Sequence, residues 1–157
     1  MGIVELDIRK EDEAEEVWAL QHPAYRLEAA LIGVADLPPL QDTVQSLRNC
    51  GETFLGFRDD DGELVGAVSY EREGTGRNAI CRMMVHPDYL RRGIASALLE
   101  SLFASAPALT VWTVTAETRN YPAIALYERF GFVRETTFRP VPGIEMASMA
   151  RPADAPT

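Results

Sequence analysis

The sequence predicts a mixed α/β fold, in which a central and mostly antiparallel sheet carries helices on both of its faces. The first observation is a set of short apolar or alternating segments, at residues 3–8, 53–57 and 64–70, that are typical of strands joined in a meander. The second is the order of the later elements, where strand and helix signals alternate before two final strands. We expect one domain over residues 1–150 and a disordered tail over residues 151–157.

The N-terminal third begins with a strand and then becomes helical. Residues 3–8 alternate apolar and polar side chains, as a half-buried strand does. A helix is predicted over residues 11–20, because carboxylates crowd its first turn, where they favour the helix dipole. Pro23 predicts a break, which a short helical piece and a loop ending at Pro38-Pro39 follow before another helix over residues 41–48.

The middle of the chain predicts a hairpin followed by a third strand. The strands at residues 53–57 and 64–70 are separated by residues 59–62, which end in an Asp-Gly pair that favours tight turns. A looser turn at residues 74–76 then leads to an apolar strand at residues 79–85.

The C-terminal half alternates strands and helices, and glycine and proline residues mark the helix ends. The predicted elements are a helix from Gly93 that ends before Pro107, a strand at residues 109–115, a helix from Pro122 to Gly131, and paired strands at residues 133–138 and 144–149.

The composition fits one globular core and argues against several function classes. The 157 residues are 46% hydrophobic, which is ordinary for a soluble domain. A net charge of −9 argues against nucleic-acid binding and favours a cationic partner such as an amine. We find neither a membrane span nor a secretory signal, so we expect no membrane partner and a cytoplasmic location. Cys50 and Cys81 lack the spacing of a metal site, so no metal is expected.

One turn carries the strongest functional signal. Gly93 lacks a Cβ, so its backbone can approach an anion closely, and it precedes a helix whose dipole is positive at this end. Ala95 and Ser96 have small side chains, so they leave room for a ligand at the first helical turn. Arg91 and Arg92 can neutralise charge from the sides. The turn therefore predicts a cradle for a phosphate or a pyrophosphate.

A second segment narrows the choice of ligand. Asn120 is followed by a helix start at Pro122-Ala123, then by Leu126-Tyr127 and by Gly131-Phe132. Together with residues 91–95, this segment resembles the GCN5-related N-acetyltransferase (GNAT) superfamily. In that family the first pattern holds the pyrophosphate of acetyl-coenzyme A (acetyl-CoA), and the second closes the other side of the cofactor groove.

The resemblance implies the acyl-CoA N-acyltransferase fold. Two parallel strands, ending here near Val85 and Thr115, would splay apart and leave a notch in which the pantetheine arm pairs with exposed backbone. Leu90 departs from the family pattern, which has arginine or glutamine at that position, and Arg91 or Arg92 would compensate. The cofactor-binding residues that the resemblance implies are Met83, Met84, Val85, Arg91, Arg92, Gly93, Ile94, Ala95, Ser96, Asn120 and Tyr127.

Transfer of an acyl group from a thioester to an amine requires polarisation of the carbonyl oxygen and protonation of the departing thiolate. The resemblance assigns the second task to the phenol of Tyr127, whose alternative role is packing beside Phe130. A backbone N–H near Met84 or Val85 is expected to bind the oxyanion. Asn120 would either bind the pantetheine arm or cap the helix that follows it.

Three candidates compete for the general base that deprotonates the amine. In some relatives a glutamate precedes the tyrosine helix; here Thr115 takes that position and Glu117 is the nearest carboxylate. The alternative for Glu117 is a solvated loop residue or a support for the helix start. His86 is a candidate because histidine is a common acid-base residue, but it precedes Pro87, where it would only position the turn. A chain of water molecules is the third candidate.

The acceptor side of the notch is predicted from residues 18–40, because the first helices of this architecture fold over it. This region includes His22, Tyr25 and Arg26, whereas its apolar residues Trp18, Leu20 and Leu31 could equally belong to the core.

Three functions fit these patterns. The first is an N-acetyltransferase that transfers the acetyl group of acetyl-CoA to an amine of a small molecule, protein or peptide. The second is a non-catalytic acyl-CoA-binding module on the same fold. The third is an interaction protein in which the Arg-Arg-Gly turn is only a turn. Relatives commonly form dimers through their terminal strands, so a homodimer is a candidate assembly.

Overall fold

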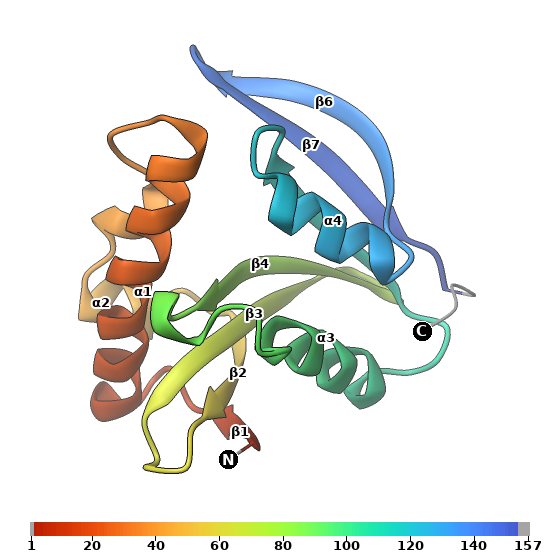
Figure 1. The fold of residues 1–157 in the computed structure, drawn as a ribbon. Coiled ribbons are helices and arrows are strands. Elements are labelled where there is room, and N and C mark those ends of the chain that lie inside the picture. The colour runs from red at the N-terminus through yellow and green to blue at the C-terminus, as the bar shows by residue number, and fades with distance from the viewer. Residues whose placement is uncertain (1, 154–157) are drawn as a thin grey trace.

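The computed structural model describes residues 2–153 and contains one mixed sheet of seven strands in the order β1-β2-β3-β4-β5-β7-β6 (Figure 1). The strands are β1 (Gly2–Leu6), β2 (Thr53–Arg58), β3 (Leu64–Gly74), β4 (Arg77–Val85), β5 (Val111–Glu117), β6 (Val133–Val141) and β7 (Ile144–Arg151). The helices are α1 (Glu11–Ile32), α2 (Val44–Arg48), α3 (Ile94–Ser105) and α4 (Tyr121–Arg129), with short 3-10 turns η1 (Pro38–Gln41) and η2 (Pro87–Tyr89).

The sheet confirms the predicted fold class. Every neighbouring pair of strands is antiparallel except β4 and β5, which run parallel. The predicted hairpin is β2 and β3, and the predicted final pair is β6 and β7. The turns at residues 59–62 and 74–76, expected as a tight and a looser turn, contain Gly62 and Gly76 with φ of 82° and 69°.

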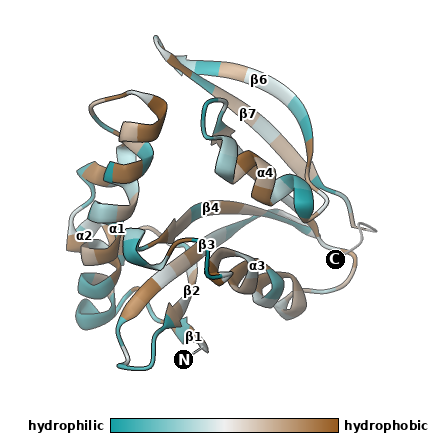
Figure 2. Cartoon of the chain, in the orientation of Figure 1, coloured by the Kyte–Doolittle hydropathy of each residue, from teal (hydrophilic) through white to brown (hydrophobic). Residues whose placement is uncertain are grey.

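Two apolar clusters fix the helices on opposite faces of the sheet. One cluster joins α3 and α4 to the sheet and includes Leu98 and Trp112. The other joins α1 and α2 to the opposite face and includes Val17, Leu47 and Met84. Figure 2 shows hydrophilic residues on the first turns of α1, where the predicted cluster of acidic side chains lies.

Helix α1 is longer than predicted, because it continues through Pro23 to Ile32. A proline inside a helix removes one backbone hydrogen bond, and the sequence therefore predicted a break there. Beyond the proline, however, Tyr25, Ala29 and Ile32 are buried at helical spacing, so packing against the sheet outweighs the local cost. The helix ends at Gly33, which has φ 78° and donates to the carbonyls of the last turn.

Three other boundaries differ from the expectations. The helix predicted over residues 41–48 splits into η1 and the short α2, which begins after the reciprocal Thr43–Ser46 capping box. Strand β5 lies two residues later than predicted. Arg151 was expected in a disordered tail, yet it is buried, ends β7, and donates from Nε to the carbonyl of Phe130 at 2.8 Å. Residues 154–157 of the predicted tail lie outside the described residues.

Among residues 2–153, no helix combines the length and the apolar character that crossing a bilayer requires.

Gly66 in β3 allows α3 to rest directly on the sheet, and its replacement by alanine tests this contact. A Cβ at Gly66 would lie 2.7 Å from Cγ2 of Ile94, the first residue of α3. We expect Gly66→Ala to lower the free energy of unfolding by about 1–3 kcal/mol, because a β-branched side chain cannot move aside freely. Urea unfolding measures the change. Gly74→Ala in the same strand is the control, since nothing lies within 4 Å of that position; equal effects of the two variants would contradict the prediction.

Candidate active site

The parallel pairing between β4 and β5 is short and leaves an edge of β4 unpaired. Arg77, Asn78 and Ala79 pair with residues 111–113, after which β5 pairs only with β7 as far as Glu117. Strand β4 continues to Val85, so its residues 80–85 have no partner on the β5 side. We call this segment the unpaired edge. The strands therefore splay as the family resemblance implied.

The direction of the backbone groups along the unpaired edge follows from the β3 register. The amide of His86 donates to the carbonyl of Val65 at 2.8 Å, and the groups of an antiparallel strand alternate in direction. The N–H and C=O groups of Met83 and Val85 therefore point away from β3, whereas those of Met84 point toward it. This geometry favours Val85 over Met84 as the donor to an oxyanion.

The turn between η2 and α3 offers backbone amides to a ligand. Gly93 adopts φ 79°, ψ 11°, and Arg91 adopts φ 62°, so both lie in the left-handed region. The first helical hydrogen bond runs from the amide of Ala97 to the carbonyl of Gly93, at 2.9 Å. The amides of residues 94–96 therefore have no acceptor in α3. A Cβ built on Gly93 meets no atom within 4 Å, so the approach to these amides is open.

The two arginines of the turn are exposed and differ in their contacts. The guanidinium of Arg92 lies over the ring of Tyr89, 4.8 Å from its centroid. The Tyr89 hydroxyl donates to Asp59 at 2.7 Å, which ties η2 to the β2–β3 turn. Leu90, which departs from the family pattern, is 45% exposed. Arg92 is thus partly oriented by its stacking, while Arg91 extends into solvent.

Tyr127 on α4 is buried and suited to donating a proton. Its ring packs against Phe132 at 5.5 Å between centroids, and the side chain is 5% exposed. Burial, together with the negative charge of Glu28, raises the pKa of the phenol. The phenol therefore stays protonated at neutral pH, as an acid for a departing thiolate must. Its predicted neighbour Phe130 instead contacts Phe103.

Both ends of the Asn120 amide are engaged within the protein. Oδ1 accepts from the amide of Ala123 at 3.3 Å and so caps α4, while Nδ2 donates to Oε1 of Glu28 at 2.5 Å. The side chain is 8% exposed. These contacts support the capping alternative over the role of pantetheine ligand.

The surroundings of Glu117 do not support the hypothesis that it acts as a base. Arg119 engages both carboxylate oxygens, and its backbone amide also donates to Oε1 at 2.6 Å. These hydrogen bonds lower the pKa of the carboxyl, which makes it a weaker proton acceptor. Arg119 Nη2 further donates to the carbonyl of Gly143, at 2.8 Å. The pair therefore connects the end of β5 to the β6–β7 hairpin.

His86 positions the turn, as the alternative interpretation held. Its Nδ1 accepts from the backbone amide of Asp88 at 3.1 Å and so begins η2. Nδ1 engaged in this way has no lone pair free for an incoming amine.

Helix α1 supplies one residue to the unpaired edge and one to the start of α4. The Tyr25 hydroxyl donates to the carbonyl of Met83 at 3.4 Å, and Glu28, one turn later, accepts from Asn120. Both lie in the region predicted as the acceptor wall, although sequence reasoning missed Glu28. Its spacing from Tyr25 was the available signal, but the predicted break at Pro23 hid it.

The apolar residues of the acceptor region divide between core and surface. Leu20 is buried, whereas Trp18 and Leu31 are 38% and 51% exposed. Trp18 donates from Nε1 to the carbonyl of Asp42 at 3.1 Å and makes an edge contact with His22 at 4.6 Å. Trp18 therefore joins α1 to the segment before α2 and is not a core residue.

Sequence reasoning also missed a polar network on the α1 face of β4. Arg82 donates to Glu52 at 2.9 Å, to Gln21 at 2.8 Å and to Asp42 at 2.5 Å. Glu52 in turn accepts from Ser69 at 2.6 Å. A charged residue inside an apolar strand was the available signal. The network joins β4, β2, α1 and the α2 segment, and every member is paired.

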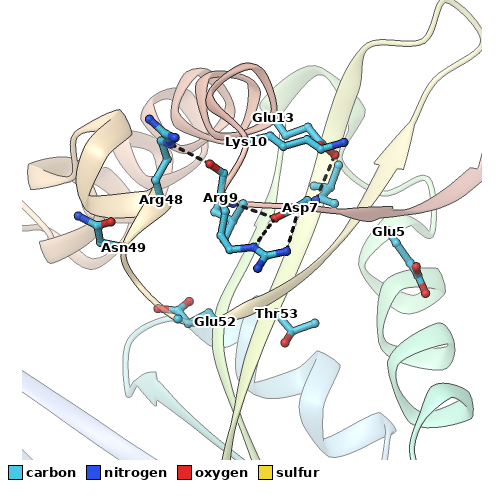
Figure 3. Close-up of a pocket in the computed structure, with 12 residues that line it drawn as sticks. Glu5, Asp7, Arg9, Lys10, Glu13, Arg48, Asn49, Glu52 and Thr53 are labelled. Carbon is cyan, nitrogen blue, oxygen red and sulfur yellow. Dashed lines mark hydrogen bonds and ion pairs between the residues drawn. The ribbon is translucent and has the colours of Figure 1, made fainter.

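A hollow of about 690 Å³ lies elsewhere, beside β1 and the start of α1 (Figure 3). Several of its charged side chains are already paired: Arg9 bonds Asp7 at 3.0 Å, and Arg48 donates to the carbonyl of Arg9 at 2.8 Å. None of the motif residues lines it. The hollow therefore adds nothing to the site built on β4.

We expect Glu117→Gln to destabilise the protein in a pH-dependent way. Loss of the buried charge should lower the free energy of unfolding at neutral pH by about 1–3 kcal/mol. Since the folded pKa lies below the ordinary 4.5, the contribution of Glu117 is present above that pH and is lost as the pH falls through the lowered value. Urea unfolding at neutral and acidic pH measures both effects. A wild-type–variant difference that stays constant into the acid range would contradict this account.

Comparisons with known proteins agree with this geometry. The chain matches the sequence model of the Acetyltransferase (GNAT) family over residues 7–132. It is 39% identical over 132 residues to the UPF0157 protein YqkA of Bacillus subtilis (strain 168), covering 83% of this chain and 38% of that protein. It is 36% identical over 93 residues to the ribosomal protein bS18-alanine N-acetyltransferase of Escherichia coli (strain K12), covering 58% of this chain and 62% of that protein.

The fold is similar to the crystal structure of the ribosomal-protein-S18-alanine N-acetyltransferase from Escherichia coli. The TM-score is 0.76 at 19% identity, over 99% of this chain and 95% of that chain. The chain spans less than two thirds of the length of the curated relatives it matches. Those matches therefore support membership of the family and do not identify a substrate. Because the family model covers most of the chain and both motif segments, this protein belongs to the GNAT family of acetyltransferases.

Proposed function

We propose that this protein transfers the acetyl group of acetyl-CoA to an amine of a small molecule or peptide by direct attack. The observation that carries the proposal is the position of the open amides of residues 94–96, which follow the unpaired edge of β4 after the single connection that contains η2. A ligand with a phosphate group at one end and an amide-bearing arm at the other matches both features.

The residues present fit such a ligand. The amides of Ile94, Ala95 and Ser96 can cradle the pyrophosphate, with Arg91 and Arg92 exposed at its sides. The pantetheine arm can pair with the backbone of Met83 and Val85, as an added strand would. The hydroxyl of Tyr25 occupies one lone pair of the Met83 carbonyl with a long bond of 3.4 Å, and the second lone pair remains for the arm.

Two groups of this chain then serve the transfer step. The amide of Val85 points toward the β5 side and can donate to the oxyanion that develops on the thioester carbonyl. The protonated phenol of Tyr127 can give its proton to the departing sulfur. We propose that this reaction takes place in the cytoplasm, in line with the sequence expectation; the candidate homodimer stays a prediction.

A thiol-release assay with acetyl-CoA tests the proposal against a panel of primary amines, polyamines, amino acids, aminoglycosides and peptides with free N-termini. The acidic chain, with a net charge of −9, favours cationic acceptors. We expect saturable thiol release that requires an amine. Cofactor binding without thiol release across the panel would instead support the non-catalytic binding module, and absence of binding would overturn both.

The open amides predict that Gly93→Ala weakens CoA binding. The variant places a Cβ beside these amides and strains a residue held at φ 79°. We expect the dissociation constant of CoA to rise about tenfold or more, equivalent to about 1.4 kcal/mol. Calorimetric titration measures it. Gly76→Ala is the matched control, because Gly76 has φ 69° and equally open space but lies in the β3–β4 turn; equal weakening in both variants would exclude a specific role for Gly93.

The acid role predicts a separation of binding from turnover in Tyr127→Phe. Removing the hydroxyl should lower kcat by about tenfold to a hundredfold, as loss of a general acid does, while the dissociation constant of acetyl-CoA stays unchanged. Steady-state thiol release and calorimetry measure the two quantities. Unchanged kcat would restrict Tyr127 to its packing role against Phe132.

A further inference from the structure

Resting on the proposed function, we infer that Glu28 of α1 binds the acceptor ammonium and takes its proton. Neither the family motifs nor the relatives assign a role to this residue. The inference deepens the proposed function, because it assigns the missing base and requires a cationic amine as the acceptor class.

Glu28 lies where α1 meets the start of α4. Its Oε1 accepts from Nδ2 of Asn120 at 2.5 Å, so a residue of α1 meets the start of α4, which carries Tyr127. Tyr25, one turn earlier on the same helix, donates to the Met83 carbonyl on the unpaired edge. Figure 1 shows the C-terminal half of α1 and α4 facing each other beside β4. Glu28 therefore lies where an acceptor would approach a thioester held on β4.

The charge balance around the Glu28 carboxylate also points to a cationic ligand. Glu28 is half-buried, yet in the part of the chain that the structure describes no lysine, arginine or histidine forms an ion pair with it. The hydrogen bond that the described residues give it comes from a neutral amide and reaches Oε1, which leaves Oε2 for another donor. A half-buried carboxylate without a cation is costly, and an ammonium group would supply the missing partner.

The surroundings of Glu28 also change the pKa of its carboxyl group. Burial raises the pKa of Glu28, the hydrogen bond from Asn120 opposes that shift, and the charge of Glu117 adds to it. The groups that face Glu28 are Tyr25 on its own helix, Tyr127 and Asn120 from α4, and Glu117 from β5. A carboxylate whose pKa is raised toward neutrality removes a proton better than Glu117, whose pKa is lowered.

The proton and electron balance of the transfer is complete with these groups. One N–H proton of the ammonium passes to Glu28 and then to solvent, which leaves a lone pair on nitrogen. That pair forms the C–N bond at the thioester carbon, and the C–S bond breaks with its electron pair going to sulfur. Tyr127 gives its proton to sulfur and recovers one from the nitrogen. The products are the amide, free CoA thiol and one released proton.

The test is Glu28→Gln, which removes the charge but keeps an oxygen to accept from Asn120. With an acceptor from the panel that is protonated at the assay pH, we expect kcat/KM to fall about a hundredfold or more. The ionisation that Glu28 contributes to the pH profile of kcat/KM should disappear, so that the remaining fall toward acid pH follows only the fraction of unprotonated acceptor. With an acceptor whose ammonium pKa lies below the assay pH, the decrease in kcat/KM should be smaller, because no proton has to be removed before attack.

Glu15→Gln is the matched control, since this substitution removes the same charge from an exposed position on the same helix. Calorimetry of acetyl-CoA binding and thermal unfolding establish that the Glu28→Gln protein is folded and loads its cofactor. An unchanged kcat/KM, or a pH profile identical to that of the wild type, would overturn the role of Glu28 while the wild-type turnover still supports the proposed function. Absence of turnover in the wild type would overturn both together.

Discussion

The hydrogen bonding between β4 and β5 stops after three residue pairs, and the arrangement of the site depends on this limit. A buried backbone group needs a partner, so the groups of Met83 and Val85 that point away from β3 call for something other than a neighbouring strand. The protein meets one of these needs with the Tyr25 hydroxyl. The remaining groups are available for a ligand that can behave as a strand.

Two polar clusters fix the positions of β4 and β5 on either side of the place where the two strands separate. On the β5 side, Glu117 and Arg119 connect the strand end to the β6–β7 hairpin through the carbonyl of Gly143. On the β4 side, Arg82 joins the strand to α1 and to the segment before α2. Because each cluster pairs its charges within the protein, neither competes for a substrate. Glu28 differs from both, since no cationic side chain among residues 2–153 pairs with it.

The sequence predicted those features that have local signals. The β2–β3 hairpin, the strand to Val85 and the helix after Gly93 follow from turn residues and apolar patterns within a few positions. The length of α1 could not be predicted in this way, because packing of Tyr25, Ala29 and Ile32 against the sheet overrides the local signal of Pro23. The contact between Glu28 and Asn120 joins residues 92 positions apart, and no local pattern announces it.

The close contact between Gly66 and Ile94 has a consequence for the choice of ligand. The first turn of α3 packs on β3 at a distance that is possible because Gly66 has no side chain. In the proposed complex, this packing would set the distance between the amides of residues 94–96 and the backbone of Val85, which the cofactor has to bridge. A residue in the sheet that the ligand does not touch would then take part in selecting that ligand by its length.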